Sequence, residues 1–152
     1  MVDYIFIILT ADDCGACNTF KNTNLKKIMD MTSKINNITV HNINLKRRSD
    51  AISERYHPQF RKPINGKWYP SFYLFTEHDF YSFNKSLTGK TIGGTFENGT
   101  MNRDPSIEYS FDANFVFNWI ISNIEKNIPV VKSSVFNMVS DSYNELEQFN
   151  VF

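Results

Sequence analysis

The sequence predicts an α/β fold in which a central mixed β-sheet is flanked by helices. Three features indicate this fold: an apolar run over residues 4–10 leads into a helical pattern, a second strand pattern follows, and a proline precedes a third strand. The order strand, helix, strand favours a parallel pair of strands joined by a right-handed crossover. A chain of 152 residues is long enough to bury one substantial hydrophobic core.

The first strand and the first helix are the most regular part of the pattern. Residues 4–10 are apolar and rich in β-branched side chains, which is typical of a strand covered on both faces. A helix is expected from residue 17 to about residue 28, with its apolar residues on one face. Either Asp12 or Asp13 is expected to cap the N-terminus of this helix.

The middle of the chain predicts two further strands separated by less regular structure. Residues 38–45 alternate between apolar and polar side chains, as a second strand requires. A short helix is expected over residues 49–56, followed by a loop over residues 59–67. Because proline is tolerated at the start of a strand but not in its middle, Pro70 sets the start of the third strand near Ser71.

The remaining pattern predicts a hairpin and a long helix. A turn at residues 77–79 and a fourth strand between residues 86 and 92 complete the hairpin, and residues 101–110 are expected to form an exposed loop. Asp112 is expected to cap a helix whose apolar stripe continues to Ile128. This helix is expected to cover one face of the sheet.

Residues 1–128 are therefore expected to form the domain, and residues 129–152 a C-terminal helical extension. Pro129 ends the preceding helix, and the extension carries apolar side chains from Phe136 to Phe149 at near-helical spacing. Such a stripe must be covered by other apolar surface. We expect it to pack on the same domain or on a partner, with homodimerisation as one possibility.

Both cysteines of the chain lie in the segment Cys14-Gly15-Ala16-Cys17, between the first strand and the first helix. Two thiols at this spacing form a disulfide that can also be broken. Cys14 is the expected nucleophile because the positive end of a helix dipole stabilises a thiolate, and Cys17 is the expected resolving thiol. The carboxylates of Asp12 and Asp13 oppose that thiolate by about 1 kcal/mol each, so Cys14 is expected to be modestly activated.

Together, the cysteine segment at a helix start and the pair Tyr69-Pro70 ahead of antiparallel strands resemble the thioredoxin-like superfamily over about residues 4–128. The resemblance implies a thioredoxin-like fold with a cis peptide bond at Pro70, which would lie against the cysteine pair. It also implies that the residue before the proline offers backbone hydrogen bonds to an extended substrate. The sequence departs from the family at Asp13, where tryptophan is usual, and at Ile8, where a buried acid is expected.

We therefore expect a thiol-disulfide oxidoreductase that acts on protein substrates through Cys14 and Cys17, without a cofactor. A dedicated protein partner and an unidentified electron donor or acceptor are expected. Trp68, Tyr69 and Pro70 are candidates for a substrate groove, although large aromatic residues near a strand start are equally typical of the core. The alternative is a catalytically weak binding or adaptor module that acts through its groove, the basic loop after the second strand, or the C-terminal helix.

Two other interpretations of the cysteines remain open at this point, a zinc site and inert buried thiols. A zinc site needs four ligands, and the three histidines are too widely spaced to complete one with the cysteines. Sixteen basic and sixteen acidic side chains cancel, which argues against binding to nucleic acid or to an anionic membrane surface. The first residues resemble no targeting signal and no stretch is long enough to span a membrane, so a cytoplasmic location is expected.

Overall fold

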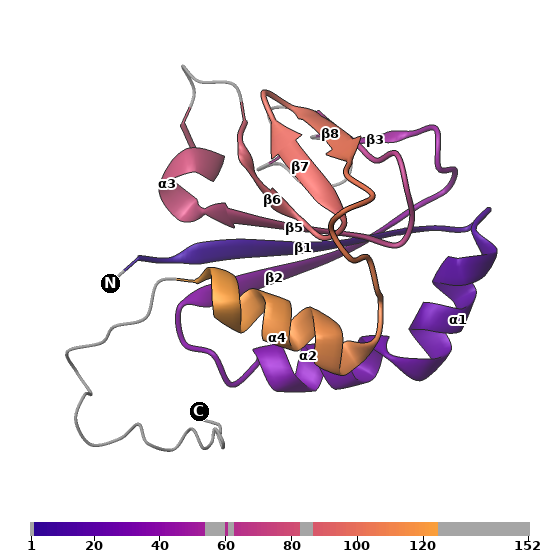
Figure 1. The fold of residues 1–152 in the computed structure, drawn as a ribbon, viewed down its shortest axis with the longest axis horizontal. Helices are drawn as coiled ribbons and strands as arrows, with labels where there is room; N and C mark the ends of the chain where they lie inside the picture. The colour runs from indigo at the N-terminus through magenta and orange to yellow at the C-terminus, as the bar shows by residue number, and fades with distance from the viewer. Residues whose placement is uncertain (1, 54–59, 61–62, 83–86, 125–152) are drawn as a thin grey trace.

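The computed structural model describes residues 2–53, 60, 63–82 and 87–124, which form a mixed α/β fold (Figure 1). The main sheet has six strands in the order β2-β1-β5-β6-β7-β8, and β3 and β4 form a small second sheet. The elements in chain order are β1 (Tyr4–Ala11), α1 (Gly15–Thr23), α2 (Leu25–Thr32), β2 (Ile38–Leu45), β3 (Ala51–Ile52), β4 (Ile64–Asn65), β5 (Ser71–Thr76), α3 (Glu77–Phe80), β6 (Gly89–Thr91), β7 (Gly94–Glu97), β8 (Thr100–Arg103) and α4 (Ala113–Asn123).

Strand β1 lies inside the main sheet, and all eight of its residues are buried. It pairs in parallel with β2, starting at Tyr4 opposite Ile38, and antiparallel with β5, where Leu9 is opposite Ser71. Strand β6 pairs antiparallel with β5. The predicted parallel pair, the start of the third strand at Ser71 and the hairpin that follows it are therefore confirmed.

The two faces of the sheet bury separate hydrophobic clusters. Because successive side chains of a strand point to opposite faces, Phe6 and Ile8 of β1 pack with α1, α2 and α4, whereas Ile7 and Leu9 pack on the other face. Figure 1 shows the three helices together on one side of β1, with β7 and β8 on the other. The cysteines belong to the cluster on the second face.

The helix expected over residues 17–28 is two helices, α1 and α2, which meet at Asn24. The backbone of Asn24 leaves helical geometry, with φ −123° and ψ −28°. Its side-chain oxygen accepts a hydrogen bond of 2.9 Å from the backbone N–H of Ala113, at the start of α4. The break thus satisfies a backbone donor at the N-terminus of a helix far away in the sequence.

Strand β3 lies within the described part of the helix expected over residues 49–56, which is not helical, and strand β4 lies within the loop expected over residues 59–67. Their pairing places Ile52 opposite Ile64, and both side chains are fully buried. A two-residue strand has no periodicity to reveal it, and the burial of these two isoleucines decides the local structure. Residues 54–56 of the expected helix and residues 59, 61 and 62 of the expected loop lie outside the described residues.

A second hairpin, β7 and β8, follows the fourth strand and occupies the start of the loop expected over residues 101–110. The turn between these strands contains Asn98 and Gly99, both with positive φ (53° and 78°), which is the geometry that an Asn-Gly pair favours. Phe96 and Met101 face the core from this hairpin. The expected turn at residues 77–79 is the short helix α3.

Asp112 caps α4 as predicted, because its carboxylate accepts hydrogen bonds from the backbone N–H groups of Asn114 and Phe115. The helix ends at Asn123, and Ile124 is extended, so the predicted continuation of the helix is wrong at Ile124. Residues 125–128 and the extension expected over residues 129–152 lie outside the described residues, and the extension stays a prediction.

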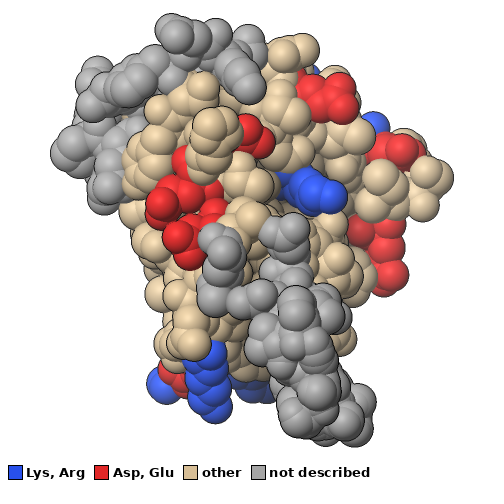
Figure 2. All heavy atoms as spheres, turned by 90° about the vertical axis from the view of Figure 1, so that its left-hand side faces the viewer, with Lys and Arg blue, Asp and Glu red and all other residues tan. Residues whose placement is uncertain are grey.

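Within the described ranges, no helix has the length and apolar character needed to cross a membrane. Figure 2 shows the end of the molecule where β1 begins, which carries both acidic and basic side chains. This mixture agrees with the balanced charge of the whole chain.

Candidate active site

Cys14 and Cys17 lie where β1 gives way to α1. Their sulfur atoms are at disulfide distance and their Cα atoms are 5.2 Å apart. Cys14, rather than Asp12 or Asp13, is the N-cap of α1, since its sulfur accepts a hydrogen bond of 3.1 Å from the backbone N–H of Cys17. A backbone donor aimed at this sulfur favours its thiolate once the disulfide is reduced.

The two cysteines differ in their access to solvent. Cys14 retains 5% of its surface exposed and borders an open groove, whereas Cys17 is fully buried. The exposed fraction of Cys14 is therefore smaller than expected for a thiol at the open end of a helix. An incoming molecule therefore reaches Cys14 through the groove, and Cys17 lies behind it.

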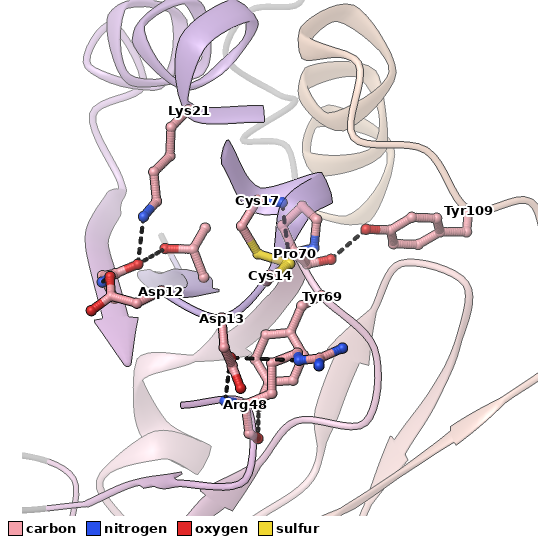
Figure 3. The surroundings of a disulfide bond; sticks show 11 residues. Asp12, Asp13, Cys14, Cys17, Lys21, Arg48, Tyr69, Pro70 and Tyr109 are labelled. Atoms are coloured by element: carbon pink, nitrogen blue, oxygen red, sulfur yellow. Dashed lines mark hydrogen bonds and ion pairs between the residues drawn. A yellow bond between two sulfur atoms is a disulfide. The ribbon is translucent and has the colours of Figure 1, made fainter. Parts of the chain in front are cut away.

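Pro70 approaches the cysteine pair from the start of β5. The Tyr69–Pro70 peptide bond is cis, as the resemblance implied. Ser71 pairs with Leu9, so the two residues before it lie beside the end of β1, and Figure 3 shows Pro70 next to the sulfur atoms. The hydroxyl of Tyr109 donates a hydrogen bond to the carbonyl oxygen of Pro70, which holds this loop from the far side.

The groove beside Cys14 has a volume of about 430 Å³. Of the three candidate substrate-binding residues, Trp68 and Tyr69 line it, whereas Pro70 is buried and does not line it. Trp68 and Tyr69 also pack against the core cluster that contains the cysteines, so they belong to the core as well as to the lining of the groove, and their substrate-binding role stays a prediction. The residues that line the groove are Cys14, Gly15, Ala16, Arg48, Ser49, Gly66, Lys67, Trp68 and Tyr69.

Three groove residues, Ser49, Gly66 and Lys67, were not candidates from the sequence, and Arg48 was expected only as part of the basic loop after the second strand. They come from loops outside the cysteine segment, and only the fold brings them to it. Gly66 has a steric role, because a Cβ atom there would lie 2.7 Å from the ring carbon Cζ of Tyr69. The absence of a side chain at this position lets the Tyr69 ring lie across the loop.

The two carboxylates before Cys14 are held by different partners (Figure 3). Asp12 accepts a hydrogen bond of 2.7 Å from the side-chain amide of Asn44, whose oxygen accepts one of 2.6 Å from Nζ of Lys21. Asp13 accepts a hydrogen bond of 2.8 Å from the backbone N–H of Arg48 and forms an ion pair with its guanidinium. Both acidic groups thus face the second strand and the loop after it.

Tyr69 is expected to make the stability of the fold fall at high pH. Burial raises the pKa of Tyr69 to about 12 from 10, and a backbone hydrogen bond at Gly66 partly offsets this. A raised pKa means that the fold favours the neutral phenol, so this contribution is complete below pH 10 and is lost as the pH rises toward 12.

Urea unfolding at several pH values between 10 and 12 tests this expectation against the Tyr69→Phe variant. Wild type should lose more stability across the interval than the variant, which has no phenol to ionise at this position. Equal losses in the two proteins would show that Tyr69 ionises as freely in the folded chain as in the unfolded one.

The remaining observations on the site concern metal ligands and known proteins. Among the described residues, no group of three or more histidine, cysteine, aspartate or glutamate side chains is placed to hold a metal ion.

Comparison of the chain with protein-family models, curated proteins and solved structures finds no match. The site is therefore characterised by its own geometry, a cysteine pair at disulfide distance at a strand-to-helix junction of an α/β fold.

Proposed function

We propose that the protein is a thioredoxin-like thiol-disulfide oxidoreductase that acts on protein substrates through Cys14 and Cys17. The observation that carries this proposal is the placement of the pair, with Cys14 at the groove and at the N-terminus of α1 and Cys17 buried behind it. The cis Tyr69–Pro70 bond beside the end of β1 and the strand order β2-β1-β5-β6 support the thioredoxin-like assignment.

In the reducing direction, the Cys14 thiolate attacks one sulfur of a substrate disulfide. The substrate S–S bond breaks, its other sulfur leaves as a thiolate that takes up a proton, and Cys14 is joined to the substrate in a mixed disulfide. Cys17 then loses its proton and attacks the Cys14 sulfur, which releases the second substrate thiol and forms the Cys14–Cys17 disulfide. Two electrons pass to the substrate, and an external dithiol must return them.

The walls of the groove have separate roles in this proposal. Trp68 and Tyr69 contact the substrate chain next to its cysteine, and Pro70 sets the distance between that chain and Cys14. Asp12 and Asp13 moderate the reactivity of Cys14. The partners are a protein thiol or disulfide and an electron donor or acceptor in the cytoplasm, and the extension over residues 129–152 packs on the domain over residues 1–128 or on a second copy.

Trapping of a mixed disulfide tests the proposal. In the Cys17→Ser variant, the Cys14 mixed disulfide cannot be resolved, so it should accumulate with a model protein disulfide such as insulin and run as a larger species on a non-reducing gel. A reducing agent should separate the two components. The Cys14→Ser variant is the matched control and should give no adduct.

If Cys17→Ser forms no adduct with either insulin or cellular proteins, the oxidoreductase proposal is wrong. The protein would then be better described as a binding or adaptor module on the same α/β framework. Mass spectrometry of any adduct from cells would identify both the substrate and the cysteine that it presents.

A further inference from the structure

We propose that Arg48 is a positioning residue for Cys14, because its guanidinium compensates the charge of Asp13 and so favours the thiolate form of the neighbouring nucleophile. This inference rests on the proposed function, since it concerns the reactivity of the same thiol. It assigns a role to a residue far from the cysteines in the sequence.

The geometry joins Arg48 to Asp13 twice. The backbone N–H of Arg48 donates a hydrogen bond of 2.8 Å to Oδ1 of Asp13, and Nε lies 3.5 Å from the same oxygen. Asp13 directly precedes Cys14, and Arg48 and Cys14 line the same groove. Figure 3 shows the Arg48 guanidinium extending past Asp13 toward Tyr69. The pair therefore links the carboxylate that precedes Cys14 to a residue that lines the groove.

The ion pair of Asp13 and Arg48 affects the stability of the Cys14 thiolate through the charges around the sulfur. The N-terminus of α1 stabilises a thiolate at Cys14, and an uncompensated carboxylate at residue 13 would act against it with similar strength. A guanidinium beside that carboxylate offsets part of its field at the sulfur. About half of each side chain in the pair is exposed (58% for Arg48 and 45% for Asp13), so salt should weaken the effect.

Arg48 also touches the opposite wall of the groove, but through a different group. Its carbonyl oxygen accepts a hydrogen bond of 2.9 Å from the hydroxyl of Tyr69. Because this contact and the N–H contact to Asp13 both use the backbone of Arg48, a side-chain substitution removes the guanidinium and leaves them in place. The charge of Arg48 can thus be tested separately from its structural contacts.

The test measures the rate of Cys14 alkylation by iodoacetamide against pH, in the full chain carrying Cys17→Ser so that a single thiol reacts. Arg48→Ala should move the midpoint of the pH profile upward by about half a pH unit or more. Arg48→Lys should keep the midpoint close to that of the parent, because lysine also carries a positive charge. Asp13→Asn should move the midpoint downward. The double variant Asp13→Asn with Arg48→Ala should return close to the parent, because it lacks both charges.

Arg47→Ala is the matched control, since Arg47 is an exposed neighbour whose backbone N–H donates a hydrogen bond to Asp50. It should leave the midpoint unchanged. The proposal is wrong if Arg48→Ala does not shift the midpoint, if Arg47→Ala shifts it equally, or if the double variant is no closer to the parent than Arg48→Ala. Alkylation needs no protein substrate, so a failure to trap mixed disulfides would count against the proposed function and not against this role of Arg48.

Discussion

Replacing Cys14 by serine is expected to abolish the reduction of insulin disulfides, with a loss on the order of 100-fold or more relative to wild type. The hydroxyl of serine is almost entirely protonated at neutral pH, and it cannot form the mixed disulfide on which the exchange depends. Because Cys14 is the cysteine that borders the groove, fully buried Cys17 cannot take its place as the first nucleophile. The measurement is insulin turbidity in the presence of dithiothreitol.

A loss of activity in Cys14→Ser must be attributed to the missing nucleophile and not to a loss of folding, so the stability of the variant is measured as well. The free energy of unfolding of the reduced wild type, measured with urea, should match that of Cys14→Ser within about 0.5 kcal/mol, since the substitution is small and keeps a side-chain acceptor at the N-cap of α1. If Cys14→Ser reduces insulin as fast as wild type, Cys14 is not the nucleophile. If wild type is no faster than dithiothreitol alone, insulin is not a substrate.

Phe72→Ala is expected to cost about 3–5 kcal/mol of the free energy of unfolding. The Phe72 ring is fully buried on the helical face of β5. Its centroid lies 6.3 Å from that of Phe6 in a stacked arrangement and 5.5 Å from that of Phe20 in an edge-on one. Removing the ring leaves a cavity between the sheet and α1. A domain of ordinary stability would lose a large share of its free energy of unfolding.

Urea unfolding gives the measurement, with an unchanged slope as evidence that only stability has changed. Phe72→Leu, which retains most of the volume, should cost about 1–1.5 kcal/mol. Ile107→Ala, at a side chain that is 39% exposed, should change stability by less than about 0.5 kcal/mol and serves as the matched control. A cost for Phe72→Ala no larger than that of the control would contradict the packing described for this face.

The sequence predicted the parts of the fold whose signals are local and repeated. The apolar run that became β1 needs burial on both faces, and the hydrophobic clusters on the two sides of the sheet supply it. The proline ahead of β5 and the Asp112 cap of α4 act within a few residues of where they stand. These elements were predictable because backbone chemistry and side-chain pattern agree there.

The parts that differed depend on distant contacts. The break at Asn24 satisfies the N–H of Ala113, and the strand at Ala51–Ile52 exists because it pairs with Ile64–Asn65. Neither partner can be identified from the local sequence. The hairpin of β7 and β8 is different, because Asn98-Gly99 between Phe96 and Met101 is a turn signal that the sequence does display.

The candidate site shows the same division. Cys14 and Cys17 could be found from their spacing, and Trp68, Tyr69 and Pro70 from the resemblance, but Arg48 and Lys67 carry no pattern that points to a groove. Even the cap of α1 was misassigned, because sulfur is a weaker acceptor than the carboxylates beside it and Asp13 is engaged by Arg48. The N-cap of α1 is thus decided by competition among nearby hydrogen-bonding groups, because Asp13 is engaged elsewhere and Cys14 takes its place.

The hydrogen bond from Tyr109 to Pro70 has a consequence for protein engineering. The site is assembled from four separate stretches of chain, around Cys14, Arg48, Tyr69 and Tyr109. A graft of the cysteine segment onto another strand-to-helix junction would carry the thiols without the groove, and a fragment that ends before Tyr109 would lack the support behind Pro70. The transferable unit for design is therefore the sheet with its surrounding loops rather than the four-residue motif.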